Sequence, residues 1–231
     1  MWWYAGLHAN LIAALRHRVP SRSAGALLDA GCGTGLLLWK LGKAFPHLPV
    51  VGLDADAGAC LFAANKSLHP VCVGSVNSLP FGDGSFTAIV SADVLCHRSV
   101  DEHLALVEFH RCLAPQGLLV LNLPAYQWMY SRHDRAVHTA RRYTRSRLHT
   151  LLRGAGLVDI QTTYWNTGLF PLMALWRKLP VRQGKSDVRE YPNIVEHSFR
   201  AVMAMENVIL KCGITLPCGG SVLATAIKPQ K

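Results

Sequence analysis

The sequence predicts an α/β fold in which a mostly parallel sheet carries helices on both faces. Short apolar runs of strand length alternate with longer amphipathic stretches along the chain, and this alternation is typical of parallel sheets. The 231 residues, 50% of them hydrophobic, are enough for a large buried core without disulfides or metals. We therefore expect a single α/β domain.

Turn and cap residues set the boundaries of the expected elements. Glycines at 31, 33 and 35 follow the first apolar run, and Pro115-Gln116-Gly117 forms a turn before a later one. Thr144 carries a hydroxyl that can cap a helix N-terminus, and Gly154 ends that helix. The expected helices cover 5–18, 36–44, 57–66, 101–113, 145–154 and 194–211, and the expected strands cover 26–30, 50–54, 71–73, 86–91, 118–123, 158–164 and 221–227.

The last two expected strands are too far apart in the chain for a hairpin turn. We therefore expect a helical insert over 169–217. An N-terminal cap helix lies within 1–21, and the core sheet is made by 22–168 together with 218–231.

The positive charge lies in the C-terminal part of the chain. Residues 1–130 contain equal numbers of basic and acidic side chains, so the net charge of +10 falls within 131–231. This distribution predicts an anionic partner, or contact with a membrane surface. The chain starts without a basic leader, and its apolar runs are far shorter than the roughly 20 residues that span a bilayer. We expect a cytoplasmic protein, with peripheral contact at the inner membrane surface left open.

The seven cysteines are scattered and form no Cys-x-x-Cys pair. This spacing favours reduced thiols and predicts neither a zinc site nor a disulfide framework.

A glycine-rich turn follows the first expected strand and precedes a helix. Glycine takes every second position of Gly31–Gly35, which permits positive φ and lets backbone N–H groups approach a ligand. Asp54 ends the next strand, where an acid accepts hydrogen bonds from a ribose. The dinucleotide fingerprint needs a glycine at position 36, where Leu36 stands. A nicotinamide cofactor is therefore disfavoured.

Five segments, in the right order, resemble the motifs of class I S-adenosylmethionine-dependent methyltransferases. They are Leu27–Gly35, Val51–Asp54, Gly74–Phe81, Ser91–His97 and Leu113–Gly117. The resemblance implies a Rossmann-like methyltransferase sheet and S-adenosylmethionine as cofactor. Segments 124–143 and 216–221, with Trp2-Trp3-Tyr4, further resemble a bacterial small-molecule methyltransferase subgroup whose substrates are largely unassigned.

The resemblance also implies where the cofactor lies. Gly31 and Gly33 would lie beside the methionine moiety, with Asp29 supporting the turn, and Asp54 would hold the ribose. The expected cofactor-binding residues are Asp29, Gly31, Cys32, Gly33, Gly35, Asp54, Ala55, Ser75, Val76 and Ser91.

Two positions depart from the family pattern. Ser75, which with Val76 would flank the adenine, stands where an aspartate is usual, so adenine recognition would use a hydroxyl and the backbone. Cys96 replaces a common glutamate, and no role is carried over to that position.

Histidines are the candidate bases for methyl transfer. A hydroxyl or amine acceptor often needs a base, and histidine titrates near neutrality. His97, His133 and His138 are the candidates, although a surface or hydrogen-bonded histidine is the more ordinary interpretation of each. His133, Asp134 and His138 lack the spacing of a metal site, and no metal is expected.

Glu206 falls in the middle of the apolar stripe of the helix expected over 194–211. A buried carboxylate needs a partner or a raised pKa. The ordinary interpretation is a buried ion pair with an arginine, and the sharper hypothesis is a general base that reaches into the acceptor pocket.

Seven arginines fall within 132–153, which contains one acid, Asp134. A solvated helix face is the ordinary interpretation. Arg145 and Arg147, however, lie in the first turn of a helix, where positive charge opposes the macrodipole. This position favours an anionic ligand such as a phosphate or carboxylate.

The sequence therefore predicts methyl transfer from S-adenosylmethionine to a small or lipid-linked, anionic acceptor. Oxygen is favoured over nitrogen because segment 91–94 lacks the Asn/Asp-Pro-Pro-Tyr motif typical of many enzymes that methylate exocyclic amines. One alternative is an RNA methyltransferase, although the basic region contains few aromatic residues for binding nucleic acid. Another is a non-catalytic cofactor-binding or membrane-associated protein.

Overall fold

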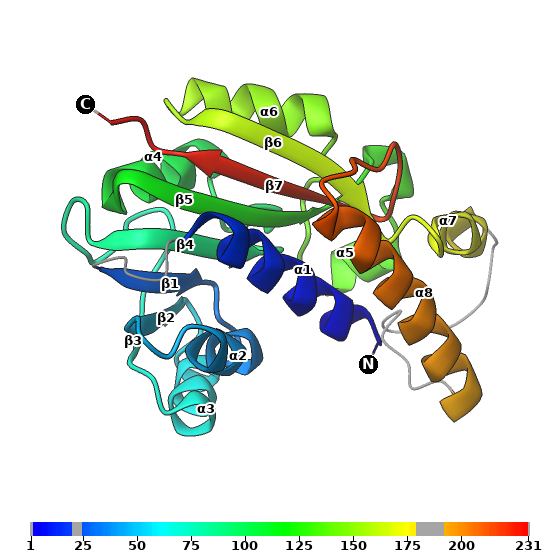
Figure 1. The fold of residues 1–231 in the computed structure, drawn as a ribbon, viewed down its shortest axis with the longest axis horizontal. Helices are drawn as coiled ribbons and strands as arrows, with labels where there is room; N and C mark the ends of the chain where they lie inside the picture. Colours follow the sequence, from blue (N-terminus) through cyan, green and yellow to red (C-terminus); the bar gives the residue numbers. More distant parts are fainter. Residues whose placement is uncertain (1, 20–24, 179–191, 231) are drawn as a thin grey trace.

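The computed structural model describes residues 2–19, 25–178 and 192–230. They form a seven-stranded sheet in the order β3-β2-β1-β4-β5-β7-β6, with helices on both faces (Figure 1). The five strands from β3 to β5 pair in parallel, and β7 runs antiparallel to both of its neighbours. The predicted mostly parallel, Rossmann-like sheet is confirmed.

The elements lie close to their expected positions. The strands are β1 (Ala26–Ala30), β2 (Val50–Asp54), β3 (Val71–Val73), β4 (Phe86–Ala92), β5 (Leu113–Pro124), β6 (Val158–Trp165) and β7 (Ser221–Ile227). The helices are α1 (Trp2–Arg18), α2 (Leu36–Ala44), α3 (Ala57–Ser67), α4 (Glu102–Cys112), η1 (Gln127–Met129), α5 (Arg132–Ala136), α6 (Arg145–Gly154), α7 (Phe170–Lys178) and α8 (Asn193–Lys211).

The start of β5 was predicted wrongly. The turn expected at 115–117 is an irregularity inside a longer strand, because Leu113 already pairs with Phe86 and the regular register resumes at Leu118. Gln116 takes a φ of 62° there, so the chain bulges without leaving the sheet.

Two hydrophobic clusters fill the space between the sheet and its helices. Alternate side chains of a strand point to opposite faces, so Ile89 and Val90 of β4 belong to different clusters. One cluster includes Phe109 of α4 and Leu148 of α6. The other includes Leu11 of α1, together with side chains from α2 and α8.

Helices α1 and α8 lie side by side although they are far apart in the sequence (Figure 1). A Cβ at Gly6 would lie 3.6 Å from Met203 of α8 and from the Trp165 ring, in ordinary van der Waals contact, so α1 packs directly against both. Both α7 and α8 lie between β6 and β7 in the chain, which supports the proposed insert. No helix within the described residues is long and apolar enough to cross a bilayer.

The carboxyl ends of β1, β2, β4, β5 and β6 point to one edge of the sheet, because only β7 runs the other way. Ligands of such sheets bind outside this edge. The glycine turn, Asp54 and the residues that follow β4 and β5 all lie there.

Candidate cofactor and acceptor site

The glycine turn after β1 packs tightly against its neighbours at Gly31 and Gly35 and is open at Gly33. Gly31, Gly33 and Gly35 have φ values of 87°, 51° and 79°. A Cβ on Gly31 would overlap the Val94 side chain, and one on Gly35 would overlap the Ala63 backbone, whereas one on Gly33 would meet nothing within 4 Å. Gly33 therefore offers open space beside the backbone, as a bound ligand requires.

Asp54 connects the turn to the end of β2. Its Oδ2 accepts a hydrogen bond from the Gly33 N–H at 2.8 Å, and its Oδ1 accepts one from the Asp56 N–H at 3.0 Å. A carboxylate oxygen has two lone pairs, so each oxygen can still accept a hydrogen bond. Asp54 thus shapes the turn and fits a ribose diol.

Asp29, at the base of the turn, is a buried carboxyl that is not fully paired. It is 1% exposed, and its Oδ2 has no hydrogen-bond partner. Burial, and then the neighbouring Asp54 carboxylate, raises its pKa to about 7. Together with the open space at Gly33, this unpaired acceptor fits a ligand that brings a donor or a positive charge.

Three other expected cofactor residues, Cys32, Val76 and Ser91, are buried. The Ser91 hydroxyl is fully buried and donates to the Ala30 carbonyl at 2.9 Å, so it joins β4 to β1. Cys32 packs against Gly52, and Val76 is 5% exposed within the core. Only the backbone of Cys32 and Val76 remains as a proposed ligand contact, and a direct contact from Ser91 is not supported.

The part of the site expected to bind the adenine is an exposed turn that begins at Ser75. Ser75 and Ala55 are exposed, and the Ser75 hydroxyl accepts a hydrogen bond from the Asn77 N–H at 3.2 Å. The Asn77 side chain in turn donates to the Ser99 carbonyl and accepts from the Asp101 N–H. This turn is thereby fixed to the chain that leads into α4.

The candidate histidines divide into two groups. His97 is half-buried, and its pKa is lowered by burial and then by His138, so it is neutral at pH 7. His138 is exposed, and its carbonyl accepts from the Arg98 N–H. His133 lies on α5. Within the described residues, no group of three or more ligand-type side chains is placed to hold a metal ion.

Glu206 has a different partner from the one expected. Its carboxylate accepts hydrogen bonds from the backbone N–H groups of three consecutive residues, 166 to 168, which follow β6. The arginine partner predicted from burial is wrong, because these amides satisfy both oxygens. A role as general base is correspondingly less supported.

Four of the seven arginines in 132–153 have partners within the chain, although Arg147 remains exposed while it is paired. Arg142 forms a fully buried ion pair with Asp134 at 2.7 Å, and Arg147 pairs with Glu102 at 2.6 Å. Arg141 donates to two backbone carbonyls, and Arg145 donates to the Thr162 hydroxyl. The segment is thereby attached to α4 and β6.

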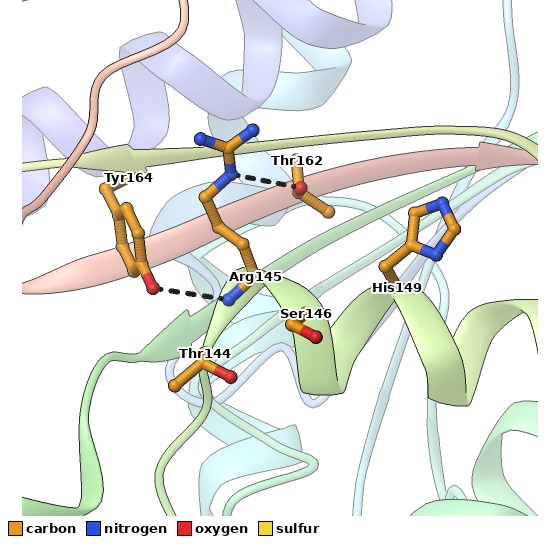
Figure 2. Close-up of a pocket in the computed structure, with 6 residues that line it drawn as sticks. All are labelled: Thr144, Arg145, Ser146, His149, Thr162 and Tyr164. Carbon is orange, nitrogen blue, oxygen red and sulfur yellow. Dashed lines mark hydrogen bonds between the residues drawn. The ribbon is translucent and has the colours of Figure 1, made fainter.

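An open hollow of about 420 Å³ lies at the start of α6 (Figure 2). It is lined by Thr144, Arg145, Ser146, His149, Thr162 and Tyr164. The α6 N-terminus follows β5, so the hollow belongs to the same carboxyl edge as the glycine turn, at the end formed by β6.

Sequence reasoning missed a buried polar chain at the end of β4. Asp93 is joined through Asn122 to Trp165. The available signal was Asn122, a single polar residue in the otherwise apolar run Leu118–Leu123.

Comparison with known proteins agrees with this geometry. Residues 28–121 match the family described as "Methyltransferase domain". Over 119 residues the chain is 33% identical to malonyl-[acyl-carrier protein] O-methyltransferase of Dechloromonas aromatica, a match that covers 51% of this chain and 43% of that protein. Over 136 residues it is 29% identical to probable tRNA methyltransferase 9B of Mus musculus, covering 58% and 28%. The chain thus spans less than half the length of these curated relatives.

The fold is also shared with solved methyltransferases. The structure of geranyl diphosphate C-methyltransferase from Streptomyces coelicolor, bound to S-adenosyl-L-homocysteine, aligns with a TM-score of 0.66 at 18% identity. The alignment covers 97% of this chain and 79% of that one. Residues 28–121 thus match a methyltransferase domain, and the fold of the described chain is that of S-adenosylmethionine-dependent methyltransferases.

Proposed function

We propose that the protein transfers the methyl group of S-adenosylmethionine to an oxygen of a small or lipid-linked acceptor that carries an anionic group. The observation that carries this proposal is the hollow at the start of α6, where an arginine, a histidine and several hydroxyls lie beside a cluster of aromatic rings. Both features belong to the edge that holds the glycine turn.

The residues for cofactor binding are the glycine turn, Asp54 and the turn that begins at Ser75. S-adenosylmethionine, when bound, supplies a methyl group that a sulfonium makes electrophilic. The chain's own contribution is to hold the acceptor in line with that methyl group and to exclude water.

Arg145 is the proposed contact for the acceptor's anionic group. Its Nε donates to Thr162 Oγ1 at 3.2 Å, and its backbone N–H donates to the Tyr164 hydroxyl at 3.3 Å (Figure 2). A guanidinium has five N–H donors, so several remain for a carboxylate or phosphate. The N-terminus of α6 adds its own partial positive charge.

Aromatic rings form an apolar wall next to this contact. Tyr126 stacks on Tyr164 with ring centroids 4.9 Å apart and lies 5.5 Å from Phe170 and 5.8 Å from Trp128. Trp128 is 54% exposed. An acceptor with a flat or apolar body next to its anionic group, including a lipid-linked one, fits such a wall.

Oxygen as the methylated atom is supported by the name of the Dechloromonas relative, an O-methyltransferase. His97, neutral at pH 7, is the proposed base where the acceptor has a proton to lose, with His138 beside it and His133 nearby in the chain.

RNA is the second candidate acceptor, because one curated relative is named a probable tRNA methyltransferase. The ion pairs of Arg142 with Asp134 and of Arg147 with Glu102 reduce the free positive charge that a phosphate backbone would need. The small acceptor is therefore favoured.

The test is to follow labelled methyl groups from S-adenosylmethionine into separate small-molecule, lipid and RNA fractions. We expect label in the small-molecule or lipid fraction. With the labelled product as substrate, Arg145→Leu should lower kcat/KM by about 10-fold or more through loss of a charge-assisted contact, with cofactor affinity unchanged.

Arg153→Leu, in the exposed last turn of α6, is the matched control and should keep wild-type kcat/KM. Label in RNA alone, or equal losses in the two variants, would contradict the proposed acceptor.

A further inference from the structure

The outward side of α8 is apolar over its C-terminal half. Met205 is 71% exposed and Val208 is 60% exposed, whereas Met203 and Glu206 are buried against the rest of the fold. At about 3.6 residues per turn, the exposed positions share one side of the helix. They are Ala201, Ala204, Met205, Val208, Ile209, Lys211 and Cys212.

Lys211 is the one charged side chain among these exposed positions. A helix that is apolar on its outward side as well as its inward side is ordinarily covered on both. The outward side of α8 is therefore expected to meet a partner.

Helix α1 continues this apolar side. The two helices lie side by side (Figure 1), and together they line an open hollow of about 440 Å³. Lys211 lies three positions after Val208, so the two side chains are neighbours on the surface of α8. The lining residues are Ala9, Ile12, Ala13, Arg16 and His17 of α1, with Lys211 of α8. The hollow and the outward side of α8 thus form one continuous surface, the α1–α8 surface.

Three basic side chains border the hollow, namely Arg16, His17 and Lys211. Arg18, also on α1, pairs with Asp159 of β6. For the three that border the hollow, no ion pair is found within residues 2–19, 25–178 and 192–230. Their charge is available to a partner.

The positions of these basic residues in their helices have an ordinary explanation. Each lies in the last turn of its helix, where positive charge complements the macrodipole. This explains each charge alone. It does not explain why the ends of two helices place their basic side chains around one apolar hollow.

The charge of the α1–α8 surface distinguishes between possible partners. In a symmetric dimer the same patch of both copies meets, so the basic side chains of one copy would face those of the other, and such like-charge contacts are unfavourable. A bilayer with anionic lipids attracts clustered basic side chains and accepts apolar side chains at the level of its headgroups. The net charge of +10 adds to this attraction.

We propose that the α1–α8 surface binds a bilayer that contains anionic lipids. Met205 and Val208 enter the boundary between headgroups and acyl chains, and the basic side chains at the hollow contact lipid phosphates. The proposal does not rest on the acceptor proposed above, because Arg145 lies on a different helix, α6.

The test is flotation of the full chain with vesicles of phosphatidylcholine alone and of phosphatidylcholine mixed with phosphatidylglycerol. We expect binding to the mixed vesicles that weakens as salt is added, and little binding to phosphatidylcholine alone. Lys211→Gln should lower the partition constant about 5-fold, the effect of one basic side chain near an anionic surface. The double variant Arg16→Gln, Lys211→Gln should lower it about 25-fold.

Val208→Asn tests the apolar contact. Valine and asparagine have similar helix propensities and the position is exposed, so the fold should be kept. Binding to the mixed vesicles should fall, and the relative loss should persist at high salt, because burial of an apolar side chain is not screened by ions.

The matched controls lie on the other face of the sheet, where α4 and α6 pack. Arg153→Gln removes an exposed basic side chain of α6, and Val107→Asn makes the same change as Val208→Asn at a position of α4 that is 56% exposed. Both should bind mixed vesicles like wild type. Thermal unfolding and affinity for S-adenosylmethionine should be alike in all of these variants.

Failure of the wild-type protein to bind mixed vesicles would overturn the proposal. So would losses in Arg153→Gln and Val107→Asn equal to those in Lys211→Gln and Val208→Asn. A dimer in sedimentation that Val208→Asn dissociates, without vesicle binding, would assign the surface to a second copy of the chain instead. Vesicle binding is measured without cofactor or acceptor, so its failure leaves the proposed methyl transfer untouched, and the reverse also holds.

Discussion

At the residue scale, the Asp54 carboxylate has two roles: it holds the glycine turn in place, and it is the proposed contact for the ribose. The hydrogen bond from the Gly33 N–H fixes the turn, and each carboxylate oxygen keeps a lone pair that can accept from a ligand. Removing the side chain therefore removes both a contact and the support of the backbone that makes the other contacts.

We predict that Asp54→Ala weakens S-adenosylmethionine binding by roughly 10- to 150-fold, the range for loss of a charged hydrogen-bond partner. Calorimetry is the measurement. Asp56→Ala is a matched control, because the Asp56 side chain caps α3 through the Gly58 and Ala59 N–H groups. Wild-type affinity in Asp54→Ala would rule out the ribose assignment.

Asp29 should make stability depend on pH. Burial raises its pKa in the folded protein to about 7, so the folded state keeps a proton that the unfolded chain releases near its ordinary value. The free energy of unfolding therefore falls as pH rises from about 4 to about 7 and then levels off.

Asp29→Asn should remove part of this slope, on the order of a few kcal/mol between pH 5 and 8. The pKa of Asp93 is also raised, so its contribution to the pH dependence of stability remains in the Asp29→Asn variant. Urea unfolding at the two pH values measures the slope, with Asp83→Asn as an exposed control. An unaltered slope in Asp29→Asn would show that the buried carboxyl is not the source.

At the scale of elements, Glu206 connects α8 to the turn between β6 and α7. The same turn is joined to the approach to β7, because the Thr167 hydroxyl donates to the Cys218 carbonyl. A carboxylate that accepts three consecutive backbone N–H groups fills an anion-binding concavity of the main chain. The burial of Glu206 on α8 is thus explained by its hydrogen bonds to backbone N–H groups of the turn that follows β6.

We predict that Glu206→Gln lowers the free energy of unfolding by about 1–3 kcal/mol, because the amide group presents N–H donors to backbone donors. Denaturant unfolding measures this loss, and affinity for S-adenosylmethionine should stay near wild type. Met205→Ala, an exposed position on the same helix, should have little effect. A stable Glu206→Gln that loses turnover would instead favour the general-base hypothesis.

At the scale of the whole molecule, the two ends of the sheet edge have opposite electrostatic character. Asp29, Asp54 and Asp93 lie around the glycine turn, whereas Arg145 and His149 lie at the start of α6. A cofactor with a cationic end and an acceptor with an anionic group would therefore be drawn to different parts of one edge.

The order of strands and helices could be predicted from the sequence because hydrophobic periodicity depends on residues a few positions apart. The glycine turn and Asp54 could be identified for a similar reason, since turn chemistry and strand ends are local. The start of β5 could not, because the irregularity at Gln116 exists only where Phe86 of β4 pairs with Leu113.

The partners of the polar side chains were decided by the tertiary structure. Asp93 meets Asn122 across neighbouring strands, Asn122 meets Trp165, and Glu206 meets a turn about 40 positions away in the chain. Arg142 and Arg147 looked solvated in the sequence and are paired in the fold. The alternation of residues determines which elements form, but strand order and helix packing determine which charge faces which donor, and that pairing decides what a charged residue can do.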